Sequence, residues 1–338
     1  MDRVGIEMDR ADEVESMKMA KPVLLEDSWE AEDVLEECRR VGIACVELTP
    51  AELENKSADE FVKESCFMCS TEIVQRQLRK FFHQAADLEE IGVVPCTYPA
   101  EFFSSSTSAS STSASAAASL AEEGENNLFN RKISKRMLSS LCAEHEELPL
   151  FVKPASNDKL FDGGVVRDAE DLARIWEQVR SASDGTGGRG GAAREVDHAP
   201  VGRDEERTNC EVYTAAVVRF VVEYRLFIGS GRLYGDAGKF YKIRAAREME
   251  QKGDLPIPPA AFLEDILRCV GPERFWVVDV GMMMFTTEVG EDTSNTTKKW
   301  GVVEVNPPFS LDDHGLPIEP YCQYCQDACE WIRSLRTE

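Results

Sequence analysis

The chain has 338 residues, of which 43% are hydrophobic, and this is enough apolar material for one large domain or two ordinary ones. Its 62 acidic residues outnumber its 38 lysines and arginines, and the net charge of −24 argues against a broad basic surface for nucleic acid. No apolar run approaches the roughly 20 residues that span a bilayer, and the charged N-terminus lacks the apolar core of a signal peptide. We therefore expect a cytoplasmic protein that binds neither nucleic acid nor membrane.

The first part of the chain alternates apolar runs with helical patterns, which predicts a small Rossmann-like α/β module at 21–102 behind a disordered leader at 1–20. No Gly-x-Gly-x-x-Gly follows the first apolar run, so the sequence does not predict a dinucleotide site there. The module could be a packing platform or contribute to substrate binding, and both interpretations stay open. The expected strands are 22–25, 43–48, 66–69 and 91–95, and the expected helices run from Ser28 to Gly42 and from Thr71 to Phe82.

A Ser/Ala-rich tract separates this module from the rest of the chain. We expect residues 103–127 to form a flexible linker or insertion, and residues 128–338 to form a larger domain. Within that domain, the polar stretches 181–208 and 286–299 are expected to be flexible insertions.

The larger domain begins with a segment that reads as a basic helix. The pattern at 130–142 predicts a helix that carries Arg131 and Lys135. Its basic face could approach nucleotide phosphates or could simply be solvated, and the sequence does not decide between the two. Three further helices are expected, at 168–179, 260–270 and 321–335.

A lysine stands at the end of a predicted strand in this domain. The run 150–154 ends in Lys153-Pro, and a loop with Lys159, Gly163 and Gly164 leads to a second strand. A strand–loop–strand unit of this kind lets backbone N–H groups surround phosphates under a flexible flap. Lys153 could neutralise phosphate oxygens there, although a lysine at a strand end can also be only a solubilising charge.

A second cation lies in the long apolar run near residue 225. Alternation along this predicted strand puts Tyr224, Leu226 and Ile228 on one face and Glu223 with Arg225 on the other. A guanidinium in a water-poor cleft favours bidentate contact with phosphate or carboxylate. The alternative is an ordinary Glu–Arg pair on the surface.

Two β-branched apolar runs near the end of the chain predict an antiparallel hairpin that carries acidic side chains. Glu304 and Asn306 share a face of one strand, and a hairpin symmetric about residues 291 and 292 would place Asp279 opposite Glu304. Like charges in that position destabilise a sheet, and a divalent cation would remove the penalty. Two carboxylates with an amide oxygen suit Mg²⁺. The alternative is a surface hairpin with two solvated acids.

The eleven cysteines include two groups that invite a zinc interpretation, Cys66-x-x-Cys69 and the series Cys322, Cys325 and Cys329. The second group has the spacing that lines one face of a helix, and free cysteine is among the most buried residue types. We therefore interpret these residues as reduced core thiols rather than as a zinc site.

The spacing of Asp279 and the Glu304-Val-Asn-Pro run, downstream of a Lys-Pro strand and a Glu-Tyr-Arg strand, resembles the ATP-grasp family. The run from Glu304 to Pro317 more narrowly resembles a branch of predicted carboxylate–amine ligases. The resemblance covers roughly residues 130–330 and is strongest in the last forty of these. It implies an α+β fold in which a Rossmann-like module precedes a two-subdomain ATP-grasp domain that holds the nucleotide between its subdomains.

This resemblance also implies roles for individual residues. Asp279, Glu304 and Asn306 would hold one or two Mg²⁺ ions, and Lys153 and Arg225 would be the catalytic cations. A strand that links the subdomains would meet the adenine and the ribose. The implied nucleotide-binding residues are Lys153, Lys159, Gly163, Gly164, Glu211, Val212, Tyr213, Arg225 and Arg131.

The implied reaction is ATP-dependent joining of a small-molecule or peptide carboxylate to an amine through an acyl phosphate. Two rivals stay open: a phosphotransferase on the same fold, and a non-catalytic ATP-binding or scaffold protein. The sequence does not reveal which acid and which amine are the substrates.

Overall fold

The computed structural model describes residues 23–26, 29–63, 71–83, 88, 92–95, 97–103, 127–143, 148–155, 160–161, 163–183, 210–235, 240–246, 249, 255–289, 293–309 and 316–336. The leader at 1–20, the strand expected at 66–69, Lys159, and most of the tracts at 103–127 and 181–208 lie outside these residues. None of the described helices is both long and apolar enough to cross a bilayer.

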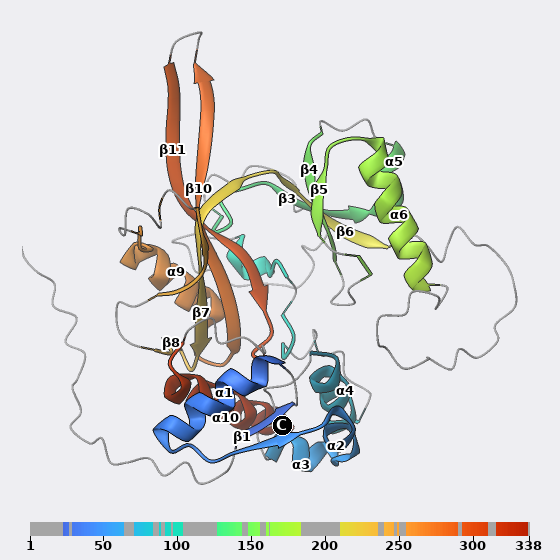
Figure 1. Ribbon diagram of the computed structural model, residues 1–338. Helices are drawn as coiled ribbons and strands as arrows, with labels where there is room; N and C mark the ends of the chain where they lie inside the picture. Colours follow the sequence, from blue (N-terminus) through green and yellow to red (C-terminus); the bar gives the residue numbers. More distant parts are fainter. Residues whose placement is uncertain are drawn as a thin grey trace, which may run out of the picture.

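The N-terminal module combines one pair of parallel strands with four helices (Figure 1). Its elements are β1 (Val23–Glu26), α1 (Trp29–Val41), β2 (Cys45–Leu48), α2 (Pro50–Asn55), α3 (Ala58–Lys63) and α4 (Thr71–Phe81). Gly42 ends α1 with φ +79°, as its position in the sequence predicts. The strand expected at 91–95 is wrong, because the described residues 92–95 form turns and bends.

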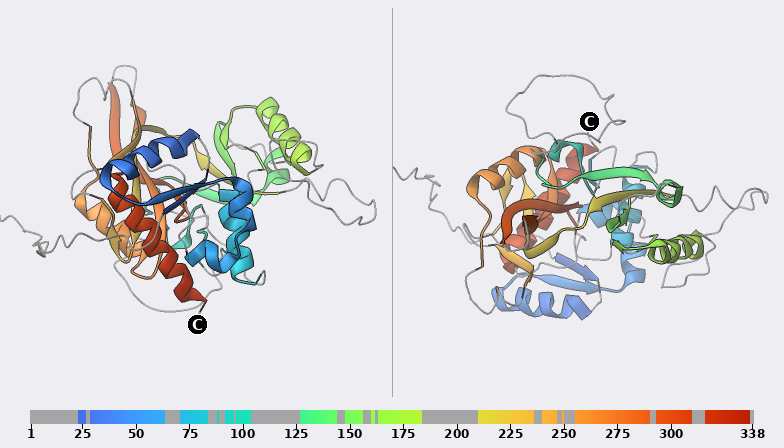
Figure 2. Two further views of the ribbon diagram at one scale, coloured as in Figure 1. Left: turned by 60° about the horizontal axis from the view of Figure 1, so that its bottom comes forward. Right: turned by 90° about the horizontal axis from the view of Figure 1, so that it is seen from above.

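The C-terminal helix α10 (Ile318–Leu335) belongs to the core of this N-terminal module. It contacts α1, α3 and β7 and runs beside the module helices in Figure 2. Its predicted cysteine face is confirmed, since Cys322, Cys325 and Cys329 are buried free thiols in that shared core. The module is therefore completed by the last described helix of the chain.

A four-stranded antiparallel sheet forms a separate small layer, with the strand order β3-β6-β4-β5. Its strands are β3 (Ile133–Met137), β4 (Leu150–Pro154), β5 (Gly164–Val166) and β6 (Glu211–Ala216). The helices α5 (Leu138–Ala143) and α6 (Ala169–Ser183) accompany it. The helix expected at 130–142 is wrong, because Ile133–Met137 pairs with β6 and only the last part is helical. Sheet pairing outweighs the local helical pattern there.

The central element is a five-stranded sheet with the order β11-β10-β7-β8, in which β9 also pairs with β7. Its strands are β7 (Arg219–Gly229), β8 (Arg232–Leu233), β9 (Tyr241–Ala245), β10 (Phe275–Val289) and β11 (Thr293–Asn306). On one face it packs against α9 (Ala260–Val270). At one end of the opposite face it meets α10.

The flexible insertion expected at 286–299 is wrong. Residues 286–289 and 293–299 extend β10 and β11 into a long hairpin that rises above the rest of the molecule (Figure 1). The stretch contains five threonines, and β-branched residues favour strands. Thr297, Lys298 and Lys299 are exposed, so polar residues in this stretch are compatible with a strand that has no buried face.

Gly301, on β11, lies against residues that enter the sheet from another part of the chain. An added Cβ would approach the carbonyl oxygen of Phe129 to 2.7 Å and collide with Met283. We therefore expect Gly301→Ala to lower the free energy of unfolding by about 1–3 kcal/mol through overpacking. Urea denaturation measures the change. Gly164→Ala is the matched control, since a Cβ there meets open space, and an equal loss in both variants would contradict the packing argument.

Candidate active site

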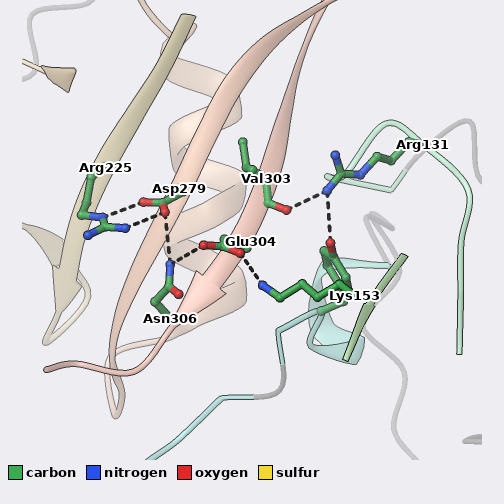
Figure 3. Close-up of polar contacts among 8 residues, drawn as sticks. Arg131, Lys153, Arg225, Asp279, Val303, Glu304 and Asn306 are labelled. Atoms are coloured by element: carbon green, nitrogen blue, oxygen red, sulfur yellow. Dashed lines mark hydrogen bonds and ion pairs between the residues drawn. The ribbon is translucent and has the colours of Figure 1, made fainter. Parts of the chain in front are cut away.

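Asp279 on β10 and Glu304 on β11 are directly opposite each other, as the sequence predicts. The hairpin reaches this pairing through a β-bulge. Below the bulge Val280 pairs with Val302, and above it Asp279 pairs with Glu304, so Val303 is the extra residue of β11. Val302 and Val305 are buried in the core, and Glu304 and Asn306 lie with Asp279 on the other face (Figure 3).

Arg225 neutralises Asp279 from the neighbouring strand β7. Their residues are partners in the sheet, and the guanidinium donates from Nε and Nη2 to the two carboxylate oxygens, both at 2.8 Å. The Asp279 residue is only 3% exposed. Burial raises the pKa of Asp279 above its ordinary value, and the charge of Arg225 and the amide of Asn306 oppose that rise. This pair is therefore a buried, bidentate ion pair rather than an ordinary surface pair.

Lys153 reaches Glu304 from the other sheet. Lys153 lies on β4, and its Nζ is 2.5 Å from Glu304 Oε2. Burial alone would raise the pKa of Glu304, but the Lys153 ammonium outweighs it and holds that pKa below its ordinary value. The two opposed carboxylates are thus each paired with a cation, and one of these pairs joins the small sheet to the central sheet (Figure 3).

The third member of the predicted metal set also lies here. The Asn306 amide donates from Nδ2 to Asp279 Oδ2 at 3.2 Å and to Glu304 Oε1 at 3.4 Å. A half-turn of this amide would present its oxygen to the same place. Two carboxylates and an amide oxygen are hard donors that fit Mg²⁺. The residues present therefore suit a magnesium ion.

Arg131 lies beside this cluster and not on the expected helix. It precedes β3, and its Nη2 donates to the carbonyl oxygen of Val303 at 2.7 Å. Its guanidinium lies over the rings of Tyr98 and Phe220, 5.8 and 5.3 Å from their centroids. Lys135, the other cation of the expected basic face, pairs with Glu211 on the small sheet at 2.8 Å.

The glycines and the predicted adenine strand occupy the small sheet. Gly163 sits against Lys153, since an added Cβ would lie 3.3 Å from the lysine Cβ, and Gly164 pairs with Val152. Val212 and Tyr213 are buried in β6, which has β3 on one side and β4 on the other. The Glu211 carbonyl oxygen accepts from the N–H of Ala155 at 2.9 Å. The backbone of Glu211–Tyr213 thus already serves the sheet, which weakens the adenine-edge role.

Two residues that the sequence reasoning gave no site role lie close to the cluster. Glu223 is 5% exposed and pairs with Arg244 of β9, and burial raises its pKa while Asp279 and Glu304 add to the rise. Its place two residues before Arg225 was the available signal. The phenol of Tyr98 feels the charges of Arg131, Lys153 and Glu304, and burial raises its pKa.

Comparisons with known proteins bear on this site. A family profile for an ATP-grasp domain, the second family of its clade, matches residues 128–324. No curated protein matches the chain.

Several solved structures are similar to the chain. A D-alanine–D-alanine ligase from Helicobacter pylori is 14% identical, with a TM-score of 0.32, and the match covers 58% of this chain and 52% of that enzyme. The chain thus spans about half the length of the Helicobacter pylori enzyme. A RimK domain ATP-grasp protein from Sphaerobacter thermophilus is 14% identical over 94% of this chain and 100% of its own, with a TM-score of 0.36. A D-alanine–D-alanine ligase from Bacillus anthracis is 12% identical over 94% and 98%, with a TM-score of 0.36.

Proposed function

The chain belongs to the ATP-grasp family, and on that premise we propose that it is an ATP-dependent carboxylate–amine ligase that uses Mg²⁺. The expected ATP-grasp membership and α+β class are confirmed. The observation that carries the proposal is the convergence of Asp279, Glu304 and Asn306 with Lys153 and Arg225, which come from two different sheets.

Each residue of the cluster has a part in the proposed reaction. Asp279, Glu304 and Asn306 would hold the ion, and Mg²⁺ bound there would supply positive charge for the β- and γ-phosphates of ATP. Since the ion would take over neutralisation of the two carboxylates, Lys153 and Arg225 could turn toward phosphate oxygens. Both would then stabilise charge on the γ-phosphoryl group as it is transferred.

The proposed chemistry has two steps. A substrate carboxylate oxygen forms a bond to the γ-phosphorus while the bond to the β–γ bridging oxygen breaks and ADP leaves. The amine nitrogen then forms a bond to the acyl carbon, phosphate leaves with the carboxylate oxygen, and the amine loses a proton. The role of Lys153, Arg225 and the buried site is to position the groups and to limit access of water.

An isotope experiment distinguishes this proposal from its rivals. The protein is screened with ATP, Mg²⁺ and amino acids, peptides and polyamines, and a turned-over acid is then supplied with ¹⁸O in its carboxylate. Ligation through an acyl phosphate transfers one ¹⁸O into the released phosphate. A phosphorylated product without label in phosphate indicates a phosphotransferase. Calorimetric binding of Mg·ATP without any turnover indicates a non-catalytic protein, and either result would falsify the ligase proposal.

A further inference from the structure

The β-bulge at Val303 is the feature that gives Asp279 and Glu304 a common face. The hairpin ladder is regular from Val289–Thr293 to Val280–Val302. If it continued regularly, Val303 would pair with Asp279 and Glu304 would pair with Val278, whose side chain lies in the core. A register shift of one residue moves a side chain to the other face. Without the bulge, the carboxylate of Glu304 would therefore face apolar side chains.

The outer edge of β11, on the side away from β10, is held by two short segments that we call the bracket, residues 97–103 and 127–131. The two segments are joined by a hydrogen bond from Leu128 N–H to the Phe102 carbonyl, at 2.9 Å. Val302 N–H donates to the Leu128 carbonyl at 2.8 Å, and Val305 N–H donates to the Thr97 carbonyl at 3.1 Å. The bracket thus fixes the strand on both sides of the bulge.

Arg131, the last residue of the bracket, contacts the bulged residue itself. Its Nη2 donates to the Val303 carbonyl at 2.7 Å, as Figure 3 shows. A bulged residue stands outside the regular ladder, and Val303 has no partner residue on β10. The guanidinium of Arg131 therefore supplies a hydrogen bond at the point where the ladder is interrupted.

Packing alone does not account for an arginine at position 131. The guanidinium lies between the rings of Tyr98 and Phe220, where an apolar side chain of similar length would also fit. Within the described residues, the buried Nε finds no acceptor, a situation that is unfavourable for a polar atom. The contact with Val303 is what an apolar side chain could not provide.

We propose that Arg131 is a positioning residue that holds the Val303 bulge and thereby keeps Glu304 opposite Asp279. This role replaces the direct phosphate contact expected from the sequence. Its effect on turnover rests on the proposed function, whereas its effect on the register of the hairpin does not.

Arg131→Met is the primary test, since methionine keeps length and packing but cannot donate. We expect the apparent affinity for Mg²⁺, and for Mn²⁺ titrated directly, to fall 10- to 100-fold, as when groups behind metal ligands are changed. Because the ligands themselves remain, kcat at saturating metal should fall less than metal affinity. Arg131→Lys, which keeps one donor, should recover part of the loss. Arg274→Met is the matched control, because Arg274 also lies over an aromatic ring, Trp276, but does not contact the bulge.

A second variant tests the mechanism through the bulge. Deletion of Val303 would make the ladder regular and still pair Glu304 with Asp279, so Arg131→Met should cost little in that background. Register is read independently from amide hydrogen exchange at Val302 and Val305 and from a structure of Arg131→Met. Unchanged exchange, register and metal affinity in Arg131→Met would overturn the proposal, and these readouts decide it even if the deletion variant does not fold. Absence of ATP turnover in the unmodified protein would instead count against the ligase function.

Discussion

Glu304→Gln is expected to reduce ATP-dependent turnover by roughly 10²–10³-fold, the scale seen when one electrostatic group of a preorganised site is removed. Glutamine keeps the shape of the side chain but removes the charge that faces Asp279 and Lys153. The site would lose one of two anionic metal donors, and Lys153 would lose its ion-pair partner. Steady-state rates of ADP release across a Mg²⁺ titration measure the effect, with the apparent metal constant expected to rise.

The fold should survive this substitution. The side chains of Lys153 and Glu304 are 26% and 29% exposed, and partly exposed ion pairs contribute little to stability. Thermal unfolding of Glu304→Gln should therefore stay close to that of Glu330→Gln, a control at an exposed position of α10 whose activity should not change. Turnover equal to that of the control, at equal metal, would reject Glu304 as part of the metal site.

Pairing of Asp279 with Glu304 was predictable from the sequence, but the reason for it was not. Alternating apolar residues and a short tip indicate a hairpin, and a centre between residues 291 and 292 gives the correct partners. The actual ladder is centred on residue 291, and the extra residue at Val303 restores the pairing. A bulge depends on what lies along the strand edge, here the Val303 contact of Arg131. No local pattern in the hairpin encodes that edge.

The approach of Lys153 to Glu304 lies even further from what a sequence pattern can show. These residues are 151 positions apart and belong to different sheets, so their contact depends on how the two sheets are placed. The strand run ending at Lys153 was readable because a short apolar run bounded by turn residues is typical of a strand. Its partner was not readable, and the neutralisation of the carboxylates by Lys153 and Arg225 was expected to come from a metal ion instead.

Long-range packing also explains the other differences. The segment at 130–142 has a helical pattern, but pairing of Ile133–Met137 with β6 determines its structure. Cysteine spacing predicted the buried face of α10 correctly, because that signal is local to one helix. The helix packs in a core with residues near the start of the chain, such as Leu35 and Phe61, and nothing in its own sequence indicates that partner.

Arg225→Lys is expected to lower kcat/KM by about 10²-fold or more, even though the charge is conserved. Arg225 makes two parallel contacts with Asp279, and its side chain is only 12% exposed. An ammonium can make one of these contacts but cannot reproduce the planar fork, and it is more costly to bury. ADP release and thermal unfolding measure both consequences. Arg232→Lys is the control, because Arg232 pairs with Asp327 at an exposed position.

The same substitution should move the pH dependence in a defined direction. Burial raises the pKa of Asp279 in the folded protein, and the charge of Arg225 opposes that rise. Weakening this contact lets the pKa rise further, so the carboxylate needed for metal binding is lost at a higher pH. The acid limb of metal-dependent kcat/KM should therefore shift to higher pH in Arg225→Lys.

Stability should respond with the opposite preference. A carboxyl whose pKa is raised by folding binds its proton more tightly in the folded state, so its contribution to stability decreases as pH rises from the unfolded toward the folded pKa. The deficit of Arg225→Lys should consequently be larger at neutral pH than in acid. An unshifted acid limb together with a stability deficit that does not vary with pH would show that Arg225 does not control the ionisation of Asp279. Its fork would then serve packing alone, and the cation that faces the proposed nucleotide would have to be Lys153.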